Sequence, residues 1–257
     1  METIVTSNYN SSKASMSQVV TKQFCNVCGC DQFVAQKRRP NVKCVVCRSL
    51  ERTRLMWLYL ERIVRPHHKI LHLAPEQGIY NRLTHIVKKE NYVTSDLFPE
   101  NFPFAEQMQI IDLCNLESQP SSHYDLIIHS HVMEHTYCSY AYTLYHLHRM
   151  LSATGKHVCV IPFIPGQYSE SLEKLSGKEK TIRFGQNDHC RKYGADDVQS
   201  HVGKVLRLPI VYDITKDFSP SRLDLCNIPE EAWRGYSINS VLVLNKHDYL
   251  LGSFMHE

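Results

Sequence analysis

Two pairs of cysteines near the start of the chain have the spacing of metal ligands. CNVC and CVVC are separated by fifteen residues. A two-residue gap lets both sulfurs of a pair face one ion, so two such pairs can bring four thiolates onto a tetrahedral zinc. The predicted ligands are Cys25, Cys28, Cys44 and Cys47. A closed site of this kind has no open position for substrate, so we expect the zinc to stabilise the fold and catalysis to lie elsewhere.

Basic side chains are dense around the second cysteine pair. Seven of them fall within eighteen residues: Lys37, Arg38, Arg39, Lys43, Arg48, Arg52 and Arg54. Such a run is either a solvated face or a surface that binds phosphate, carboxylate or nucleic acid. Both interpretations stay open on the sequence alone.

Length and composition are typical of a soluble globular protein. The 257 residues are 43% hydrophobic and carry a net charge of +3, which neither implies nor excludes a polyanionic partner. No run reaches the roughly 18 apolar residues of a membrane helix, and the first residues lack the apolar centre of a signal peptide. Five of the ten cysteines crowd into residues 25–47, which favours metal binding over disulfides. We therefore expect a cytoplasmic protein with no membrane insertion.

The chain divides into four predicted parts. Residues 1–22 are polar and form an expected disordered tail, and residues 23–50 form the small zinc-ribbon-like module. Apolar residues then recur at helical intervals over 51–66, which predicts a helix that links the module to a main domain over 67–257.

Short apolar runs alternate with amphipathic stretches after Pro66, which predicts an α/β fold whose parallel sheet is covered on both faces. The predicted strands are 69–73, 92–95, 109–111, 124–128 and 157–161, with helices over 80–89 and 140–151. A polar loop is expected over 162–180 and a helix near 195–202. Two last strands, over 206–214 and 238–244, are expected to pair as an antiparallel hairpin at the sheet edge.

The segment KILHLAPEQG, Lys69 to Gly78, ends the first predicted strand where a doubly wound sheet binds its ligand. The pattern of residues 69–244 resembles class I S-adenosylmethionine-dependent methyltransferases, of the type 11-like kind. That family usually has an acidic residue and then glycines here, whereas this chain has His72, Ala74 and Glu76 and keeps Gly78. The resemblance implies a doubly wound, mostly parallel, Rossmann-like sheet of seven strands, with the zinc module appended at its N-terminal side.

Three later motifs carry the resemblance further. TSD ends the second strand with Asp96, where the family binds both ribose hydroxyls, and QIIDLCNL places Asp112 and Leu113 where the family holds adenine. YDLIIHSHVMEH is similar to the fourth strand and the loop that lines the methyl donor. By this resemblance, the cofactor-binding residues are His72, Ala74, Pro75, Glu76, Gly78, Asp96, Leu97, Asp112, Leu113, His129 and Ser130. Glu76 is expected to pair with the ammonium of the methionine moiety.

A metal site is an alternative explanation for the histidines of YDLIIHSHVMEH. The potential ligands there are His129, His131, Glu134 and His135. The methyltransferase pattern explains the same residues without a metal, and Val132 occupies the place where a zinc protease has its glutamate. We therefore prefer the methyl-donor interpretation.

The segment RFGQNDHCRKYG, Arg183 to Gly194, is predicted to form part of the acceptor pocket, because similar segments occur in small bacterial methyltransferases. His189 is the expected catalytic base, oriented by Asp188, with His131 as the second candidate. Arg191, Tyr193 and Gln186 are expected to bind the substrate.

These expectations predict methyl transfer from S-adenosyl-L-methionine to an oxygen or nitrogen atom of a small-molecule or glycan-type acceptor, with a structural Zn²⁺ beside it. One alternative is an RNA methyltransferase that captures RNA with its basic zinc module. Another is a non-catalytic binding protein whose altered first motif reflects a lost cofactor site.

Overall fold

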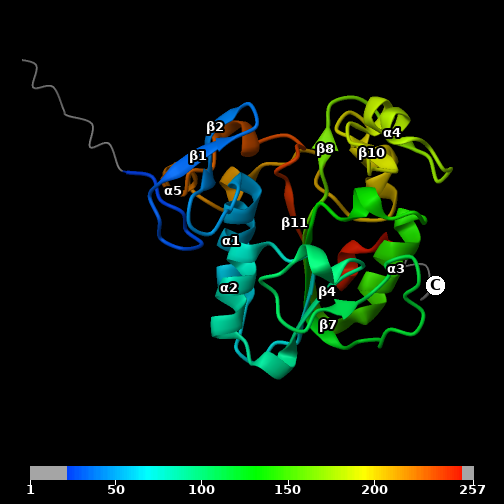
Figure 1. The fold of residues 1–257 in the computed structure, drawn as a ribbon, viewed down its shortest axis with the longest axis horizontal. Coiled ribbons are helices and arrows are strands. Elements are labelled where there is room, and N and C mark those ends of the chain that lie inside the picture. The colour runs from blue at the N-terminus through cyan, green and yellow to red at the C-terminus, as the bar shows by residue number, and fades with distance from the viewer. Residues whose placement is uncertain (1–21, 251–257) are drawn as a thin grey trace, which may run out of the picture.

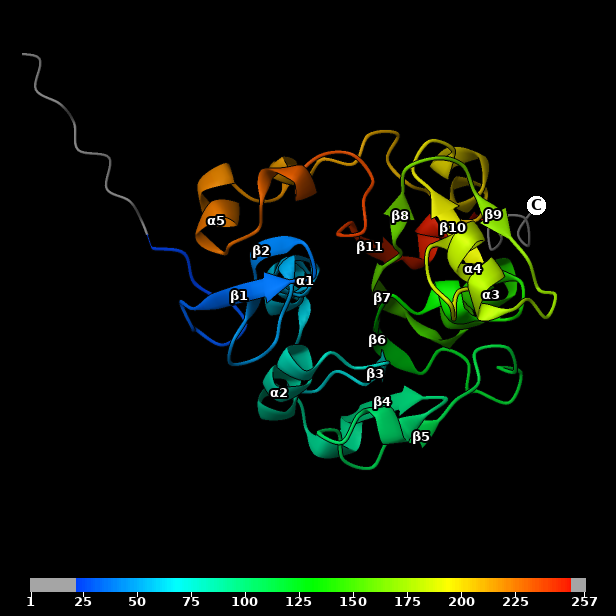
Figure 2. The same cartoon turned by 45° about the horizontal axis from the view of Figure 1, so that its top comes forward.

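A computed structural model describes residues 22–250 of the chain. Its centre is a six-stranded sheet (Figure 1) whose order, β11-β7-β6-β3-β4-β5, can be followed in Figure 2. All neighbours are parallel except β11, which is antiparallel to β7. The strands are β3 Ile70–Leu73, β4 Tyr92–Asp96, β5 Gln109–Ile110, β6 Tyr124–Ser130, β7 Leu151–Val160 and β11 Val241–Asn245. The mixed α/β class with a mostly parallel sheet is confirmed.

Strand β3 lies where the strand order reverses. The chain builds β4 and β5 on one side of β3 and then crosses to build β6 and β7 on the other side. The register pairs Leu71 with Val93 of β4 and with Ile127 of β6. Because these strands are parallel, their carboxyl ends meet at one edge, and the crevice at that edge is where open α/β sheets bind ligands.

Helices cover both faces of the sheet (Figures 1 and 2). Helices α1 Glu51–Ile63 and α2 Gln77–Ile86 lie on one face and α3 Tyr140–Met150 on the other, whereas α4 Gly177–Phe184 packs on the small sheet described below and α5 Pro220–Leu225 lies near the N-terminal hairpin. Successive residues of a strand point to opposite faces, so Ile70 packs in one cluster with residues of α1 and α2, and Leu71 packs in another with residues of α3. Fully buried strands such as β3, in which all four residues are inaccessible, follow from this double cover.

Helix α1 is buried on most of its sides. At its start, the Leu50 N–H donates to Thr53 Oγ1 (3.1 Å), and the helix ends shortly before Pro66. Leu55, Met56 and Trp57 are all almost completely inaccessible. A helix that is buried on most of its sides must lie between two other layers. Helix α1 lies between the sheet and the N-terminal cysteine segment.

The N-terminal module shares the core of the main domain. It contains the hairpin of β1 Phe33–Gln36 and β2 Arg39–Cys44, flanked by the two cysteine turns. Cys25 and Val27 belong to the same buried cluster as Ile70 and Val241 of the central sheet. Figure 2 shows β1 and β2 beside α1, with α5 nearby. The module is therefore packed onto the sheet domain rather than tethered to it.

A second, small sheet forms where the sequence predicts a polar loop over 162–180. Its order is β8-β10-β9, with β8 Phe163–Ile164, β9 Ser169–Glu170 and β10 Arg191–Gly194. The loop prediction is wrong at these strands and at the start of α4. Two-residue strands have too few positions to show an alternating pattern, which is why they were not predicted.

Three other predictions are corrected. The central sheet has six strands rather than seven, because residues 206–214 form no strand: Leu206 makes an isolated bridge to Tyr249, and Pro209 has no N–H for a ladder. Strand β11 consequently pairs with β7 and not with a hairpin partner. The helix expected over 195–202 is a pair of 3₁₀ turns, separated at His201 by a backbone with φ −120° and ψ −84°.

Short 3₁₀ helices make up the remaining regular structure: η1 Lys89–Asn91, η2 Pro99–Asn101, η3 Met133–His135, η4 Val198–Ser200, η5 Val202–Lys204, η6 Ile214–Lys216, η7 Glu230–Ala232 and η8 Lys246–Asp248. Among residues 22–250, none of the helices has the length and apolarity required to cross a bilayer. Residues 1–21 of the expected tail lie outside the described part of the chain.

Candidate functional site

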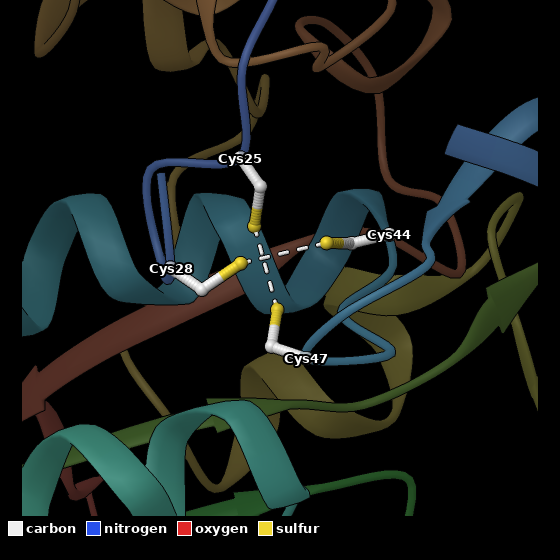
Figure 3. A group of neighbouring side chains, drawn as sticks. All are labelled: Cys25, Cys28, Cys44 and Cys47. Atoms are coloured by element: carbon white, nitrogen blue, oxygen red, sulfur yellow. Dashed lines mark hydrogen bonds between the residues drawn. The ribbon is translucent and has the colours of Figure 1, made fainter. Parts of the chain in front are cut away.

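The four predicted metal ligands converge. Cys25, Cys28, Cys44 and Cys47 place their sulfurs within 4.8 Å of one another (Figure 3). The Sγ atoms of Cys25 and Cys47 are 3.5 Å apart, as are those of Cys28 and Cys44. Four sulfurs at about 2.3 Å from a tetrahedral zinc would lie about 3.8 Å apart, so this donor set fits the ion.

The surroundings of the cysteines favour a thiolate at Cys25. Hydrogen bonding from Cys47 and Ser49 outweighs burial and lowers the pKa of Cys25 to about 4, whereas burial raises the pKa of Cys28 to about 11.

Arg54 is completely buried beneath the module and donates to the carbonyl oxygens of Val42, Ser49, Cys226 and Asn227. This arginine therefore ties the cysteine turns to the segment after α5.

The basic run around the second cysteine pair does not form one solvated face. Arg54 is buried, and Arg39 pairs with Glu51 of α1. Arg52 points to the sheet edge, where it lies 3.3 Å from Glu76. Lys37, Arg38 and Arg48 remain exposed. Part of the basic charge thus serves internal contacts.

The turn between β3 and α2 is hydrogen-bonded to the neighbouring strand β4. Ala74 has a left-handed backbone, with φ +45°, and its N–H donates to Ser95 O at 2.8 Å. A non-glycine residue in this conformation is strained. The next residues, Pro75 and Glu76, lead into α2, so the chain makes the predicted tight bend with the smallest side chain that has a Cβ.

Glu76 has a partner that the sequence analysis missed. Its Oε1 accepts a hydrogen bond from Thr53 Oγ1 (3.0 Å) and lies 3.3 Å from Arg52 Nη2. Arg52 Nε also donates to Ser130 Oγ (3.2 Å) at the end of β6. One arginine of α1 therefore bridges the ends of two neighbouring strands. Glu76 Oε2 is buried and has no hydrogen-bond partner among the described residues.

A cavity of about 280 Å³ lies beside this turn. Its walls come from five places: the β1–β2 hairpin, the segment 47–50, the start of α1, the turn Pro75–Gly78, and the segment 101–104 after β4. Arg52 and Glu76 both line it. The cysteine module thus forms one wall of the cavity at the carboxyl end of β3.

Gly78 is constrained by the cysteine module. A Cβ at this position would lie 3.1 Å from Val27 Cγ1 and 3.3 Å from Cys47 O. The retained glycine therefore allows α2 to pack closely against the second cysteine turn.

The two aspartates predicted for ribose and adenine lie at the same sheet edge. Asp96 ends β4, and its Oδ1 accepts from the Phe98 N–H at 2.8 Å. Asp112 follows β5 and accepts in the same way from the Cys114 N–H at 2.9 Å. Leu97 is exposed and Leu113 is buried. Each carboxylate caps its own turn with one oxygen and keeps a second oxygen for other contacts.

His72 and His129 are buried inside the sheet rather than in the crevice. His72 Nδ1 is 2.8 Å from the Tyr92 hydroxyl, and burial lowers the His72 pKa to about 3. The ring of His129 lies against that of His157 of β7, with centroids 4.8 Å apart and tilted planes, and burial lowers the pKa of His129 to about 4. The potential metal ligands nearest to His129 are His157 and Cys159, not the Glu134 and His135 with which the sequence alternative grouped it.

The loop after β6 begins with strained backbone at His131, which has φ +57°. His131 Nε2 lies 3.0 Å from Ile238 O, and its Nδ1 lies 3.4 Å from Glu134 Oε1. Burial alone would raise the pKa of Glu134, but the adjacent His131 and His135 outweigh burial and the pKa is lowered. The loop therefore holds an ionised carboxylate in the interior.

The expected base and its expected partner are not paired with each other. His189 is buried, and its Nδ1 faces Phe184 O at 3.3 Å. Asp188 instead lies 3.5 Å from Nδ1 of His135. The rings of His135 and His189 are in edge contact, with centroids 4.7 Å apart. His135 and Glu134 thus belong to the same cluster as His189.

Arg191 and Tyr193 are internal. Arg191 is completely buried, forms an ion pair with Glu170 (2.7 Å), and donates to Met133 O, Thr136 Oγ1 and Cys138 O. Tyr193 is 1% exposed and packs among other aromatic rings. Gln186, by contrast, is exposed. Arg191 therefore fastens the loop after β6 to the small sheet.

No family model matches the chain, and no curated protein matches it significantly. Among solved structures, the YcgJ protein from Bacillus subtilis is 14% identical with a TM-score of 0.42, covering 68% of this chain and 78% of that one. Coclaurine N-methyltransferase bound to N-methylheliamine and SAH is 14% identical with a TM-score of 0.39, covering 58% and 46%. A TehB-like SAM-dependent methyltransferase from Corynebacterium glutamicum is 21% identical with a TM-score of 0.33, covering 48% and 66%. Similarities this weak carry no conclusion about function.

Proposed function

We propose that the protein is an S-adenosylmethionine-dependent methyltransferase that acts on an oxygen or nitrogen atom of a small-molecule or glycan-type acceptor. One observation supports this most strongly. The crevice at the strand-order reversal contains a strained turn at Ala74, a cavity beside Pro75–Gly78, and the carboxylate of Asp96 on the next strand, of which Oδ1 caps the following turn. A vicinal diol, an adenine ring and a charged amino-acid tail need such a set of groups along one edge.

The proposed positions follow the strands. The ribose hydroxyls donate to Asp96, and the adenine lies beside Leu97, Asp112 and Leu113. The amino-acid tail of the cofactor enters the cavity, where Arg52 offers its guanidinium to the carboxylate and Glu76 Oε2 accepts from the ammonium. Glu76 thus pairs with the ammonium group, and Arg52 pairs with the carboxylate at the other end of the same amino-acid tail.

When bound, S-adenosylmethionine supplies an activated methyl group on a sulfonium, so the protein mainly has to position the acceptor and remove a proton. His189 is the proposed base, since its Nε2 is buried without a partner among the described residues, and His131 is the second candidate. Asp188 acts through His135 in this proposal, and exposed Gln186 contacts the acceptor.

The four cysteines are proposed to hold a structural Zn²⁺. The convergence of the sulfurs supports this, and the zinc would keep one wall of the cavity in place. Elemental analysis of purified protein should find zinc bound by the module, and Cys28→Ser should lose it.

Calorimetric titration with S-adenosylhomocysteine tests the proposed cofactor site. Replacing Asp96 by Ala removes the acceptor for two hydroxyls, so we expect affinity to fall by about 1.5–3 kcal/mol. The control is Asp224→Asn on α5, whose exposed carboxylate contacts Gln23 and is remote in sequence from the strand ends. Equal affinity of wild type and Asp96→Ala would refute the assignment of Asp96, and absence of binding to wild type at millimolar ligand would refute the function.

A further inference from the structure

Three side chains converge beyond the end of β6. The proposed function gives them no common role. Glu134 and His135 lie on η3, and His189 comes from the loop before β10. Each offers one ligand atom, and these atoms lie within 4.8 Å of one another. The set is one carboxylate and two imidazoles, a combination that binds first-row divalent metals.

Three of the potential ligand atoms have no hydrogen-bond partner among the described residues, although Glu134 Oε1 lies 3.4 Å from His131 Nδ1. Glu134 is 1% exposed, and neither of its oxygens has a hydrogen-bond partner among the described residues. The same holds for His189 Nε2, on a side chain that is 7% exposed. A buried carboxylate without hydrogen bonds is costly, and a bound cation would remove that cost.

In both histidines, the ring nitrogen that points away from the cluster faces an oxygen acceptor, as it does in metal sites. His189 Nδ1 faces Phe184 O at 3.3 Å, and His135 Nδ1 faces Asp188 Oδ2 at 3.5 Å. A hydrogen on Nδ1 that is donated to a carbonyl or carboxylate leaves the Nε2 lone pair for a metal, which is the usual orientation of metal-bound histidines. His135 Nε2 lies 3.9 Å from Glu134 Oε1, so it is directed into the cluster.

The two segments are fixed to each other without help from an ion. Cys190 N–H donates to Glu134 O at 3.0 Å, next to His189 in the chain. Arg191 donates to Met133 O and to Thr136 Oγ1, on both sides of the cluster. The ligands are therefore held in position in advance, as a tight metal site requires.

We infer that Glu134, His135 and His189 form a second metal site, distinct from the four cysteines, for a divalent ion of the zinc, iron or manganese class. Three protein ligands leave at least one coordination position open. The side chain of His135 is 37% exposed, so solvent reaches the cluster. The competing explanation is an ion-pair cluster without metal, in which Glu134 is balanced by the neighbouring His131 and His135 at 3.4 and 3.9 Å.

A role in catalysis, unlike the metal site itself, rests on the proposed function. An acceptor hydroxyl in the open position would have its pKa lowered and would lose its proton to solvent. Its oxygen would then form the C–O bond as the methyl C–S bond breaks, leaving neutral S-adenosylhomocysteine. A coordinated His189 Nε2 cannot also accept the proton, so the ion would replace His189 as the activating group.

Cobalt titration of the full chain under reducing conditions tests the site. In addition to any ion held by the four cysteines, we expect one Co²⁺ per chain to bind. This additional ion should show ligand-field absorption and no thiolate charge-transfer bands. Glu134→Gln and His135→Ala should each abolish this absorption, and Asp188→Asn should weaken Co²⁺ binding about 10–100-fold. His247→Ala, which removes an exposed histidine outside the cluster, should leave it unchanged.

The site is overturned if wild type binds no such ion, or if the absorption survives in both Glu134→Gln and His135→Ala. It is also overturned if the additional ion shows thiolate bands, because His129, His157 and Cys159 would then be its ligands. If Glu134→Gln does not fold, His135→Ala decides the question, since its side chain is partly exposed. Cofactor binding is measured separately, so failure of the metal site and failure of the proposed function remain distinguishable.

Discussion

Arg191 is a charged residue whose complete burial indicates a structural role. From its sequence neighbours it resembles an acceptor-binding side chain, yet it is completely buried and uses its donors on Glu170 and on three oxygens of the loop after β6. Its partners are 21 to 58 residues away in the chain. Local sequence cannot reveal such distant partners, whereas the cysteine pairs could be recognised because their spacing is local.

Replacing Arg191 tests this structural role. Arg191→Lys keeps the charge but cannot reach all four partners, so buried acceptors lose their donors. We expect the free energy of unfolding to fall by about 3–5 kcal/mol, measured by urea denaturation. Lys192→Ala, at the next position of β10, is the control. If Arg191→Lys keeps full stability and loses only affinity for an acceptor, the residue binds substrate after all.

His72 makes stability depend on pH. Burial lowers its pKa to about 3 in the folded chain, compared with about 6.5 when unfolded. Protons therefore bind preferentially to the unfolded state, and this part of the stability is complete above pH 6.5 and declines as the pH falls from there towards 3. The expected slope from this residue is about 1.4 kcal/mol per pH unit.

Urea unfolding at several pH values between 7 and 4 measures this effect. His72→Gln should flatten the pH dependence by that amount and can keep a hydrogen bond to Tyr92. His67→Gln, at an exposed position before β3, should behave like wild type. An unchanged slope in His72→Gln would mean that His72 is protonated in the folded protein.

At the scale of elements, the contact between α2 and the second cysteine turn depends on Gly78. We expect Gly78→Ala to cost about 1–3 kcal/mol of stability, because the added methyl meets Val27 and Cys47. Gly177→Ala is matched, since it lies in the first turn of α4 and its new Cβ would come no closer than 3.4 Å to Asn187. Thermal unfolding of both variants measures the difference. Equal stability of the two would show that the module is not closely packed on α2.

The elements that the sequence predicted best are those with strong local periodicity. The buried run of β3 and the apolar positions of α1 were identified because several residues repeat one pattern. The small sheet was missed because β8 and β9 have two residues each. The strand expected over 206–214 from its apolar residues does not form, and Pro209 within it cannot donate a ladder hydrogen bond. The bridge from Arg52 to Glu76 joins two elements, so no pattern within either one predicts it.

For the whole molecule, the cysteine module and the sheet act as one body around the crevice. They share a buried cluster, and the module supplies a wall of the cavity beside Pro75–Gly78. The strand-order reversal fixes where a ligand should bind, and the resemblance to methyltransferases proposes which ligand. What no local pattern could supply is the arrangement of Arg52, Glu76 and Ser130 across that edge.

A crystal structure of the protein in complex with S-adenosylhomocysteine tests the central claim most directly. We expect density for the ligand along the carboxyl ends of β3 and β4, with both ribose hydroxyls on Asp96 and the amino-acid tail in the cavity with Arg52 and Glu76. A ligand bound elsewhere, or a ribose that makes no contact with Asp96, would contradict it.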